Sequence, residues 1–220
     1  MSTPHHDGDD EITARERILE AAFAAFMENG YAATSTLEIA TRARVSKREL
    51  YALVGNKQEM LVACIAERAG RLQVPAHLPL PRDRHTLEQL LSSFGAQLIH
   101  EISDPTVVGV FRLAVAEAIH APEVGRALDS IGRETSRAAL RGIMRQAVTF
   151  GLVSGRPAKL ADQFGSLLLG DLMISLLLGV ARRPSARDIA ERARDAAAAF
   201  LQLHPPRADA ATDRRTHARG

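Results

Sequence analysis

Apolar residues recur every three or four positions along most of the chain, which is the spacing that places them on one face of an α-helix. No segment shows sustained alternation of apolar and polar residues, so no strand is expected. The composition agrees, because Ala, Leu, Arg and Glu are abundant, Trp is absent and aromatic residues make up only 4%. The sequence therefore predicts an all-α fold.

Three short helices are expected near the N-terminus. The first covers residues 13–29 and stops at an Asn-Gly pair. Two Ser-x-x-Glu capping boxes, Ser35–Glu38 and Ser46–Glu49, predict that the second helix begins at Thr36 and the third just after Ser46. Only residues 43–45 separate these two helices, and three residues are too few for anything but a sharp turn. The pattern predicts a helix-turn-helix that packs on the first helix, a three-helix head.

A fourth helix, from Lys57 to about Leu72, is expected to link this head to the rest of the chain. The segment from Gln73 to Arg84 carries three prolines, a density that excludes a helix. Beyond it, apolar spacing and cap signals predict five helices in an antiparallel bundle, about nine in the whole chain. These five are expected to cover residues 86–103, 105–119, 122–150, 157–180 and 185–204.

The expected domain organisation follows these elements. The chain has 220 residues, of which 46% are hydrophobic, which is enough for a proper core. We expect the following division: a disordered N-terminus at 1–10, a head at 11–72, a connection at 73–84, a second domain at 85–204 and a disordered tail at 205–220.

The charge and the cysteine content indicate which surfaces and which cellular compartment to expect. The formal net charge is only +2, so any basic surface is local. The single Cys64 excludes an intramolecular disulfide and a multi-thiolate metal site, which suits a reducing cytoplasm, and its apolar surroundings predict a buried structural thiol. The first ten residues are acidic and polar rather than a signal peptide. A cytoplasmic protein is expected.

Basic side chains gather around the predicted corner. They are Arg42, Arg44, Lys47, Arg48 and Lys57, with only Glu49 opposing them. A short helix with such a face fits the major groove of DNA. A solvated charged surface is the simpler explanation for any one of these residues, and it is their combination with the two caps that favours DNA.

The same stretch resembles the tetracycline-repressor (TetR) family of bacterial regulators. The family's run of Thr-x-x-x-x-Ile-Ala, then Val-Ser-Lys, then Leu-Tyr, then a Lys opening the next helix is matched here by Thr34, Ile39, Ala40, Val45, Ser46, Lys47, Leu50, Tyr51 and Lys57. The resemblance covers about residues 11–72. Two departures stand out: Arg44 replaces the common turn glycine, at a cost of about 1 kcal/mol in the left-handed region, and Arg48-Glu49 changes the side chains that would read bases.

The resemblance implies a homodimer that binds a palindromic operator in double-stranded DNA, because two related heads read two half-sites. Phosphates are expected to be held by Thr34, Ser35, Tyr51 and Lys57, and base edges to be reached by Lys47, Arg48 and Glu49. Thr36, Arg44 and Ser46 complete the expected DNA-binding set. The operator sequence cannot be carried over.

Residues 164–180 are apolar nearly all round. The segment is shorter than the roughly 20 residues that cross a bilayer, and Asp171 near its middle would cost about 2.5–3.5 kcal/mol there. No membrane is therefore expected, and the segment is predicted to be buried between two protomers. The expected interface residues are Leu168, Leu176, Leu177 and Ala197.

The resemblance also implies a small hydrophobic effector bound inside the second domain. Apolar residues on successive helices are expected to line its pocket, with two polar ones at the edge; the simpler explanation is that they fill a core. The apolar set is Phe94, Leu98, Phe111, Val115, Met144, Phe164, Leu168 and Met173, and the polar pair is Gln97 and Arg112.

The sequence contains no complete signature of an enzyme active site. Glu117-x-x-His120 has the spacing of half a di-iron motif, but no second copy exists. Residues 151–155 lack the Lys-Ser/Thr of a phosphate loop, and no nucleophile elbow is present. No catalytic residue, metal or cofactor is expected. The alternatives are a helical adaptor or interaction protein without sequence-specific DNA binding and, least favoured, a small-molecule enzyme in the C-terminal bundle. Retention on heparin that falls steeply with salt would discriminate against the adaptor.

Overall fold

A computed structural model describes residues 13–70 and 80–206 of the chain, and the regular elements in these ranges are all helices. The prediction of an all-α fold with a three-helix head and a helical bundle is confirmed. The described elements are α1 (Ala14–Asn29), α2 (Thr36–Ala43), α3 (Lys47–Leu53), α4 (Lys57–Gly70), α5 (Arg84–Ile102), α6 (Pro105–Ala116), α7 (Pro122–Ala127), the π-helical segment η1 (Leu128–Arg133), α8 (Glu134–Thr149), α9 (Pro157–Leu169), α10 (Leu172–Leu178) and α11 (Ala186–Leu203). The predicted disorder at 1–10, most of the tail and most of the proline-rich connection lie outside the described residues.

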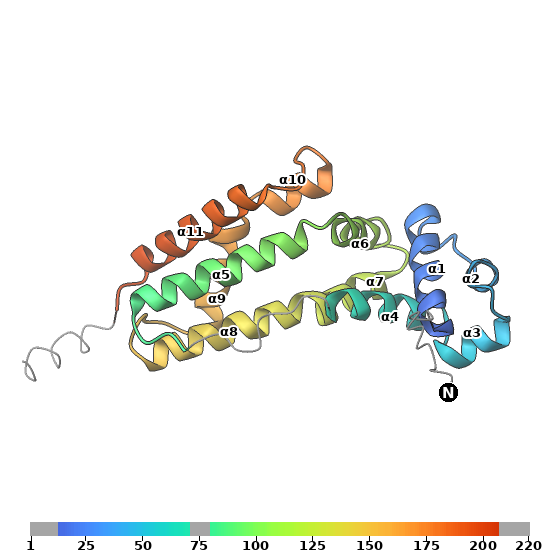
Figure 1. The fold of residues 1–220 in the computed structure, drawn as a ribbon, viewed down its shortest axis with the longest axis horizontal. Coiled ribbons are helices and arrows are strands. Elements are labelled where there is room, and N and C mark those ends of the chain that lie inside the picture. The colour runs from blue at the N-terminus through green and yellow to red at the C-terminus, as the bar shows by residue number, and fades with distance from the viewer. Residues whose placement is uncertain (1–12, 71–79, 207–220) are drawn as a thin grey trace, which may run out of the picture.

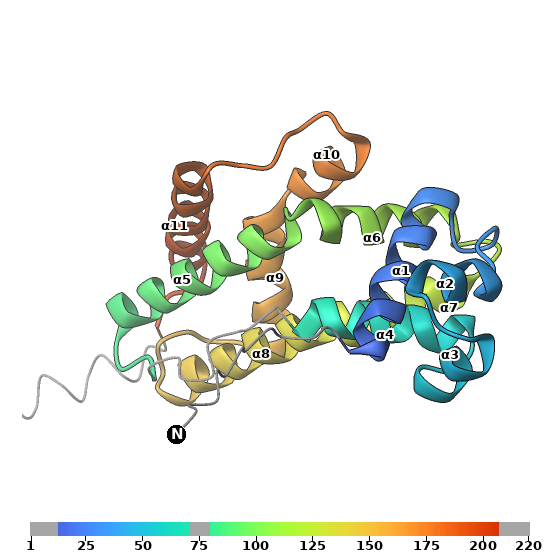
Figure 2. The ribbon, with the colours of Figure 1, turned by 45° about the vertical axis from the view of Figure 1, so that its right-hand side comes forward.

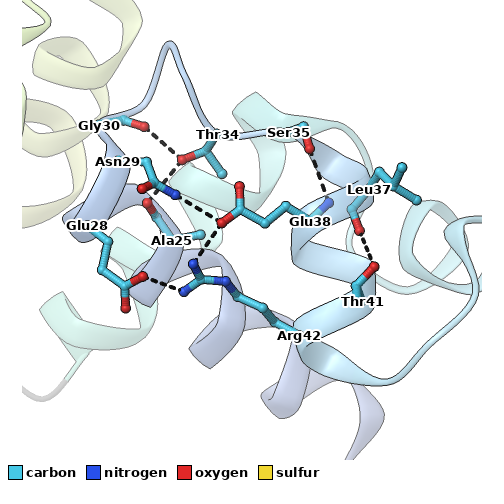
Figure 3. Close-up of polar contacts among 10 residues, drawn as sticks. All are labelled: Ala25, Glu28, Asn29, Gly30, Thr34, Ser35, Leu37, Glu38, Thr41 and Arg42. Atoms are coloured by element: carbon cyan, nitrogen blue, oxygen red, sulfur yellow. Dashed lines mark hydrogen bonds and ion pairs between the residues drawn. The ribbon is translucent and has the colours of Figure 1, made fainter.

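The helices of the head begin where the caps predict. The hydroxyl groups of Ser35 and Ser46 accept the backbone N–H groups of Glu38 and Glu49, each at 3.1 Å. Each cap is only half of the expected capping box, because neither glutamate carboxylate returns to its serine. The Glu38 carboxylate instead accepts hydrogen bonds from Asn29 and Arg42, which joins α2 to α1 (Figure 3).

Two of the long helices expected in the bundle are interrupted, which is why the described part holds eleven α-helices. Residues 122–150 form α7, η1 and α8 in succession. Residues 157–180 form α9 and α10, which meet at an angle of 51°. Gly170 ends α9 with φ +47°, a conformation that L side chains rarely adopt. Arg192 of α11 donates to the carbonyl oxygens of Leu168 and Leu169 at 2.7 and 2.6 Å, so the carbonyls left open by the break are satisfied.

Within the described residues, no single helix is long and apolar enough to cross a membrane, and only the bent pair of α9 and α10 reaches that length and composition together.

The bundle has its own core. Helices α5, α8, α9 and α11 bury their apolar faces against one another, and both views show them at the end of the molecule away from α1–α3 (Figure 1, Figure 2). Phe164 of α9 and Phe200 of α11 meet edge to face with ring centroids 5.7 Å apart. This arrangement is favourable for two aromatic rings because the positive edge of one faces the negative face of the other.

The head does not close its core by itself. Buried residues of α1–α4 form one continuous cluster with α6, α7 and the start of η1. From these later elements the cluster takes Val110, Leu113, Ala114, Ala121, Val124, Ala127 and Leu128. The ends of α6 and α7 therefore complete the head, as their position against α1 and α4 in Figure 2 shows.

The loop between α1 and α2 is held from two sides. The Lys57 ammonium group at the start of α4 donates to the carbonyl oxygens of Tyr31, Ala32 and Thr34 at 2.9, 3.2 and 3.1 Å. Just past the end of α6, the Glu117 carboxylate, only 8% exposed, accepts the N–H of Ala32 at 3.2 Å. Burial raises the pKa of Tyr31 in this loop, with smaller effects of the same sign from Glu123 and Glu117. The loop that leads into the helix-turn-helix thus contacts both α4 and the end of α6.

Candidate nucleic-acid interface and ligand cavity

The corner of the helix-turn-helix is formed without distortion despite its arginine. Arg44 has φ +55° and ψ +45°, and it is the only non-glycine residue with positive φ in the described ranges. The N–H of Val45 donates to the carbonyl of Ala40 at 3.0 Å, and the N–H of Arg44 to that of Thr41 at 3.2 Å. These are the two hydrogen bonds of a Schellman motif, which usually places glycine at this point. Arg44 therefore adopts the backbone that a glycine would, at a steric cost.

The surface of α3 carries the expected cationic side chains. Leu50 is fully buried, whereas Lys47, Arg48 and Glu49 are exposed on the first turns of the helix. Tyr51 is 44% exposed, its hydroxyl lies 3.3 Å from that of Thr36, and its ring lies 5.9 Å from the Lys47 ammonium. The tyrosine thereby connects the start of α2 to the exposed face of α3.

Arg42 does not belong to this basic face, contrary to the sequence prediction. Its guanidinium group pairs with Glu28 and Glu38 at 2.7 Å each (Figure 3). The hydrogen bond to Glu28 makes the largest contribution to raising the pKa of Arg42. The residue is exposed, but it connects α2 to α1 and two carboxylates offset its charge; the other exposed basic residues at the corner are Arg44, Lys47 and Arg48.

Two residues carried over from the family motif face inward. The side chain of Thr34 is buried, with 2% of the residue exposed, and its hydroxyl is 2.7 Å from the carbonyl oxygen of Gly30 and 3.0 Å from that of Ala25 (Figure 3). The hydroxyl does not reach the surface in this conformation, so it is not placed for the predicted phosphate contact. Lys57 uses its ammonium group on the three loop carbonyls described above. A motif match identifies such positions but does not tell whether their side chains point out or in.

A cavity of about 670 Å³ lies between α4, α5, α6, η1, α8, α9 and α10. This volume lies within the usual range for small-molecule sites. Three of the predicted pocket residues line it, namely Leu98, Phe111 and Met173, and so does Leu177, which was predicted at the dimer interface.

The other predicted pocket residues lie elsewhere. Phe94, Met144, Phe164 and Leu168 are at most 3% exposed and belong to the bundle core. Val115 is 68% exposed at the surface. The two polar residues are used locally: Gln97 donates to Glu101 at 3.1 Å, and Arg112 donates to the carbonyl oxygens of Leu176 and Leu177 at 2.9 and 3.0 Å.

The cavity has a polar side that the sequence reasoning missed. Arg133, Arg137 and Arg141 line it from the end of η1 and from α8, together with Ser136, and Asp162 and Ser166 line it from α9. The missed signal is their spacing: arginines four residues apart share one face of a helix. Ile65 of α4 also lines the cavity, which connects its wall to the helix that starts at the head.

The predicted dimer residues are mostly interior. Leu168 and Ala197 are fully buried in the protomer and Leu176 is 5% exposed, so these three present little surface to a partner. The break at Gly170 turns α10 relative to α9 and brings neighbouring residues outward. The exposed apolar side chains of this region are Leu167, Ile174, Leu178 and Val180, at 38%, 60%, 71% and 76%.

The Glu-x-x-His pair does not lie on one face of a helix, as the di-iron spacing would require. Helix α6 ends at Ala116, so Glu117 and His120 lie in the turn beyond it. Glu117 is directed at the head loop and His120 is exposed. Within residues 13–70 and 80–206, no three His, Cys, Asp or Glu side chains are grouped so that they could hold a metal ion.

The fold and the helix-turn-helix define the class of a DNA-binding regulator, and comparison with protein families agrees. Residues 18–64 match the model of bacterial regulatory proteins of the tetR family, and residues 89–204 match the C-terminal domain of AefR-like transcriptional repressors. The second match alone covers more than half of the chain. The chain belongs to the TetR family of bacterial transcriptional regulators.

Solved structures of similar proteins share this fold. The flavonoid-responsive regulator FrrA is 28% identical with a TM-score of 0.76, over 89% of this chain and 98% of that one. A TetR transcriptional regulator from Agrobacterium tumefaciens is 25% identical with a TM-score of 0.71, over 88% and 96% of the two chains. A TetR-family regulator from Pseudomonas syringae pv. tomato is 27% identical with a TM-score of 0.65, over 87% and 96%. Among curated proteins, none matches this chain.

Replacing Arg44 by glycine is expected to stabilise the protein. Glycine adopts the left-handed conformation without the steric cost of a Cβ, so Arg44→Gly is predicted to raise the free energy of unfolding by about 1 kcal/mol and Tm by about 2–4 °C. Arg48→Gly is the matched control, because the same substitution inside a helix is expected to cost about 1 kcal/mol. Thermal unfolding without DNA measures both. Equal destabilisation by the two variants would contradict the strain at Arg44.

Proposed function

We propose that this protein is a ligand-responsive repressor that binds a palindromic operator as a homodimer. The observation that carries the proposal is the exposed cationic face of α3, held in place by two serine caps and by the Tyr51–Thr36 contact. A short, rigid helix with free positive side chains at its N-terminal end is suited to the major groove. The C-terminal match to a repressor family supports the direction of regulation.

The proposed contacts follow from exposure. Lys47 and Arg48 read base edges from the first turn of α3, with Glu49 beside them. Ser35, Thr36, Arg44, Ser46 and Tyr51 lie where phosphates would pass the starts of the two helices, and a helix N-terminus is favourable for a negative charge. Lys57 acts by holding the loop before α2, so its effect on DNA affinity is indirect.

The test of DNA reading is selection of bound duplexes from a random pool, followed by affinity measurements on the selected site. Arg48→Ala is expected to change the preferred base at its position by about 1–3 kcal/mol. Arg145→Ala, at an exposed position on α8, is the control and is expected to select the same site as the original protein. Arg48 does not read bases if Arg48→Ala selects the unchanged site with an unchanged preference. A pool without an enriched, near-palindromic sequence would contradict the proposed function itself.

The homodimer is proposed to form through the exposed apolar residues of α9 and α10. One protomer leaves apolar side chains of this region exposed: Leu167 of α9, Ile174 and Leu178 of α10, and Val180 just beyond α10. A two-fold interface uses the same surface twice, so two heads would be placed for two half-sites.

Leu178→Arg is expected to prevent dimer formation, because a buried charge without a partner is strongly unfavourable at an interface. Light scattering should then give the mass of one chain, and operator affinity should fall steeply. Ile119→Arg is the control, since Ile119 is an apolar residue that is 87% exposed but lies in the turn beyond α6 and not in the proposed interface. A Leu178→Arg variant that remains dimeric with full operator affinity would place the interface elsewhere.

A ligand in the cavity is proposed to change DNA affinity by moving α4 and α6, which both contact the loop before the helix-turn-helix. The cavity is walled by Ile65 of α4 and by Val110 and Phe111 of α6. Helix α4 begins at Lys57 and α6 leads to Glu117, and both residues hold the loop before the helix-turn-helix. If a ligand binds one arrangement of these helices more tightly than the other, it stabilises that arrangement. DNA affinity then changes by at most the difference between the two ligand affinities. A coupling of about 1–3 kcal/mol would give a change of roughly 5- to 150-fold.

A further inference from the structure

We propose that the ligand of this cavity is an anionic amphiphile, with an apolar body among the helices and a carboxylate or similar group bound by arginines of α8. This inference rests on the proposed function, because it takes the cavity to be the effector site. It adds the chemical class of the ligand, which follows from how charge is distributed around the cavity.

The walls of the cavity select an apolar body. Leu98 and Ile102 of α5, Phe111 of α6, Leu140 of α8 and Met173 of α10 face it from different sides. Burial of apolar surface drives binding without directional requirements, so these walls favour a hydrophobic chain or ring. They do not by themselves determine which end of a ligand points where.

The orientation of the ligand is determined by the arginine face of η1 and α8. Arg133, Arg137 and Arg141 succeed one another at intervals of four residues and all line the cavity, whereas Asp162 is the single acidic residue that lines it. Asp129 and Glu134, which pair with these arginines, do not line the cavity, so a ligand on this side would meet three guanidinium groups and one carboxylate. A ligand whose charged end is negative is therefore bound better than one whose end is neutral or positive.

The three arginines can exchange their present partners for a ligand. One oxygen of Asp129 serves both Arg133 and Arg137, at 3.1 Å each, and Arg141 contacts Glu134. These arginine side chains are 52%, 40% and 37% exposed, so their ion pairs are screened by water and contribute little to stability. A guanidinium group carries five N–H donors, which leaves several for a bidentate contact with a carboxylate.

The π-helical segment η1 contributes two residues to the cavity wall. Leu128 and Arg133, at its two ends, both line the cavity. Single π-helical turns occur frequently at functional sites, because they change the direction of side chains along an otherwise regular helix. Here η1 joins the head core, through Leu128, to the arginine face of α8.

The test compares three unbranched probes of ten carbons each, whose head groups are negative, neutral and positive: decanoate, decan-1-ol and decylammonium. Each is titrated by calorimetry into the full-length protein at pH 7, the two ionic probes below their micelle concentrations and decan-1-ol below its solubility limit. We expect decanoate to bind about tenfold more tightly than decan-1-ol, as hydrogen bonds to a charged group would give, and decylammonium to bind most weakly. The preference for decanoate is expected to shrink as salt is raised.

Variants assign the preference to the arginines. In Arg137→Gln/Arg141→Gln, decanoate is expected to lose its advantage of about tenfold, while decan-1-ol binds as before, which also shows that the variant is folded. Arg145→Gln is the matched control, because Arg145 continues the same spacing on α8 but does not line the cavity. It should leave all three affinities unchanged.

Several outcomes would overturn the inference: equal binding of the three probes, tightest binding of decylammonium, binding of none of them, or a decanoate preference that survives the double variant. Operator affinity is measured separately with each probe at saturation. If decanoate binds through the arginines but does not change operator affinity, the ligand class stands and the proposed ligand-responsive repression fails for that probe. If the protein selects no DNA site, the DNA-binding proposal fails while the titrations remain decisive for the ligand.

Discussion

The packing of α6 and α7 against the three-helix head is the constraint on which the rest of the structure depends. Val110, Leu113 and Val124 are at most 7% exposed and lie in the same core as Phe26 and Leu50. Each buried side chain of this size contributes about 1.5–3 kcal/mol, so a head separated from these helices would lose a substantial part of its stabilisation. The packing of the head, which carries the helix proposed to read DNA, thus depends on elements from the C-terminal half of the chain.

This shared core gives the cavity a direct structural route to the head. The side chains of Ile65 and Phe111 belong to or pack against the head core and also line the cavity. The helices that carry them lead to Lys57 and Glu117, whose hydrogen bonds hold the loop before α2. A ligand that separates α4 from α6 would therefore disturb one loop from two directions. No long chain of intermediate contacts is required, because the same helices serve both sites.

Local signals in the sequence predicted the helix starts well, because a cap involves only neighbouring residues. Ser35, Ser46 and Ser185 each stand directly before a helix, as expected. The break at Gly170 was missed, since glycine within an apolar run is compatible with either a continuous or a broken helix. Apolar spacing also predicted that Phe164 and Phe111 face inward, but it could not separate a core position from a cavity wall. That distinction depends on how several helices meet.

The central claim, that the head shares its core with α6, α7 and the start of η1 and therefore unfolds together with the rest of the chain, can be tested by equilibrium unfolding in urea. The chain has no Trp and two Tyr, Tyr31 and Tyr51, both in the head. Tyrosine fluorescence therefore reports unfolding of the head, whereas circular dichroism at about 222 nm reports all helices. The shared core predicts that both signals change at the same urea midpoint and with the same steepness. A fluorescence transition complete at a urea concentration that leaves most of the helical signal intact would contradict it.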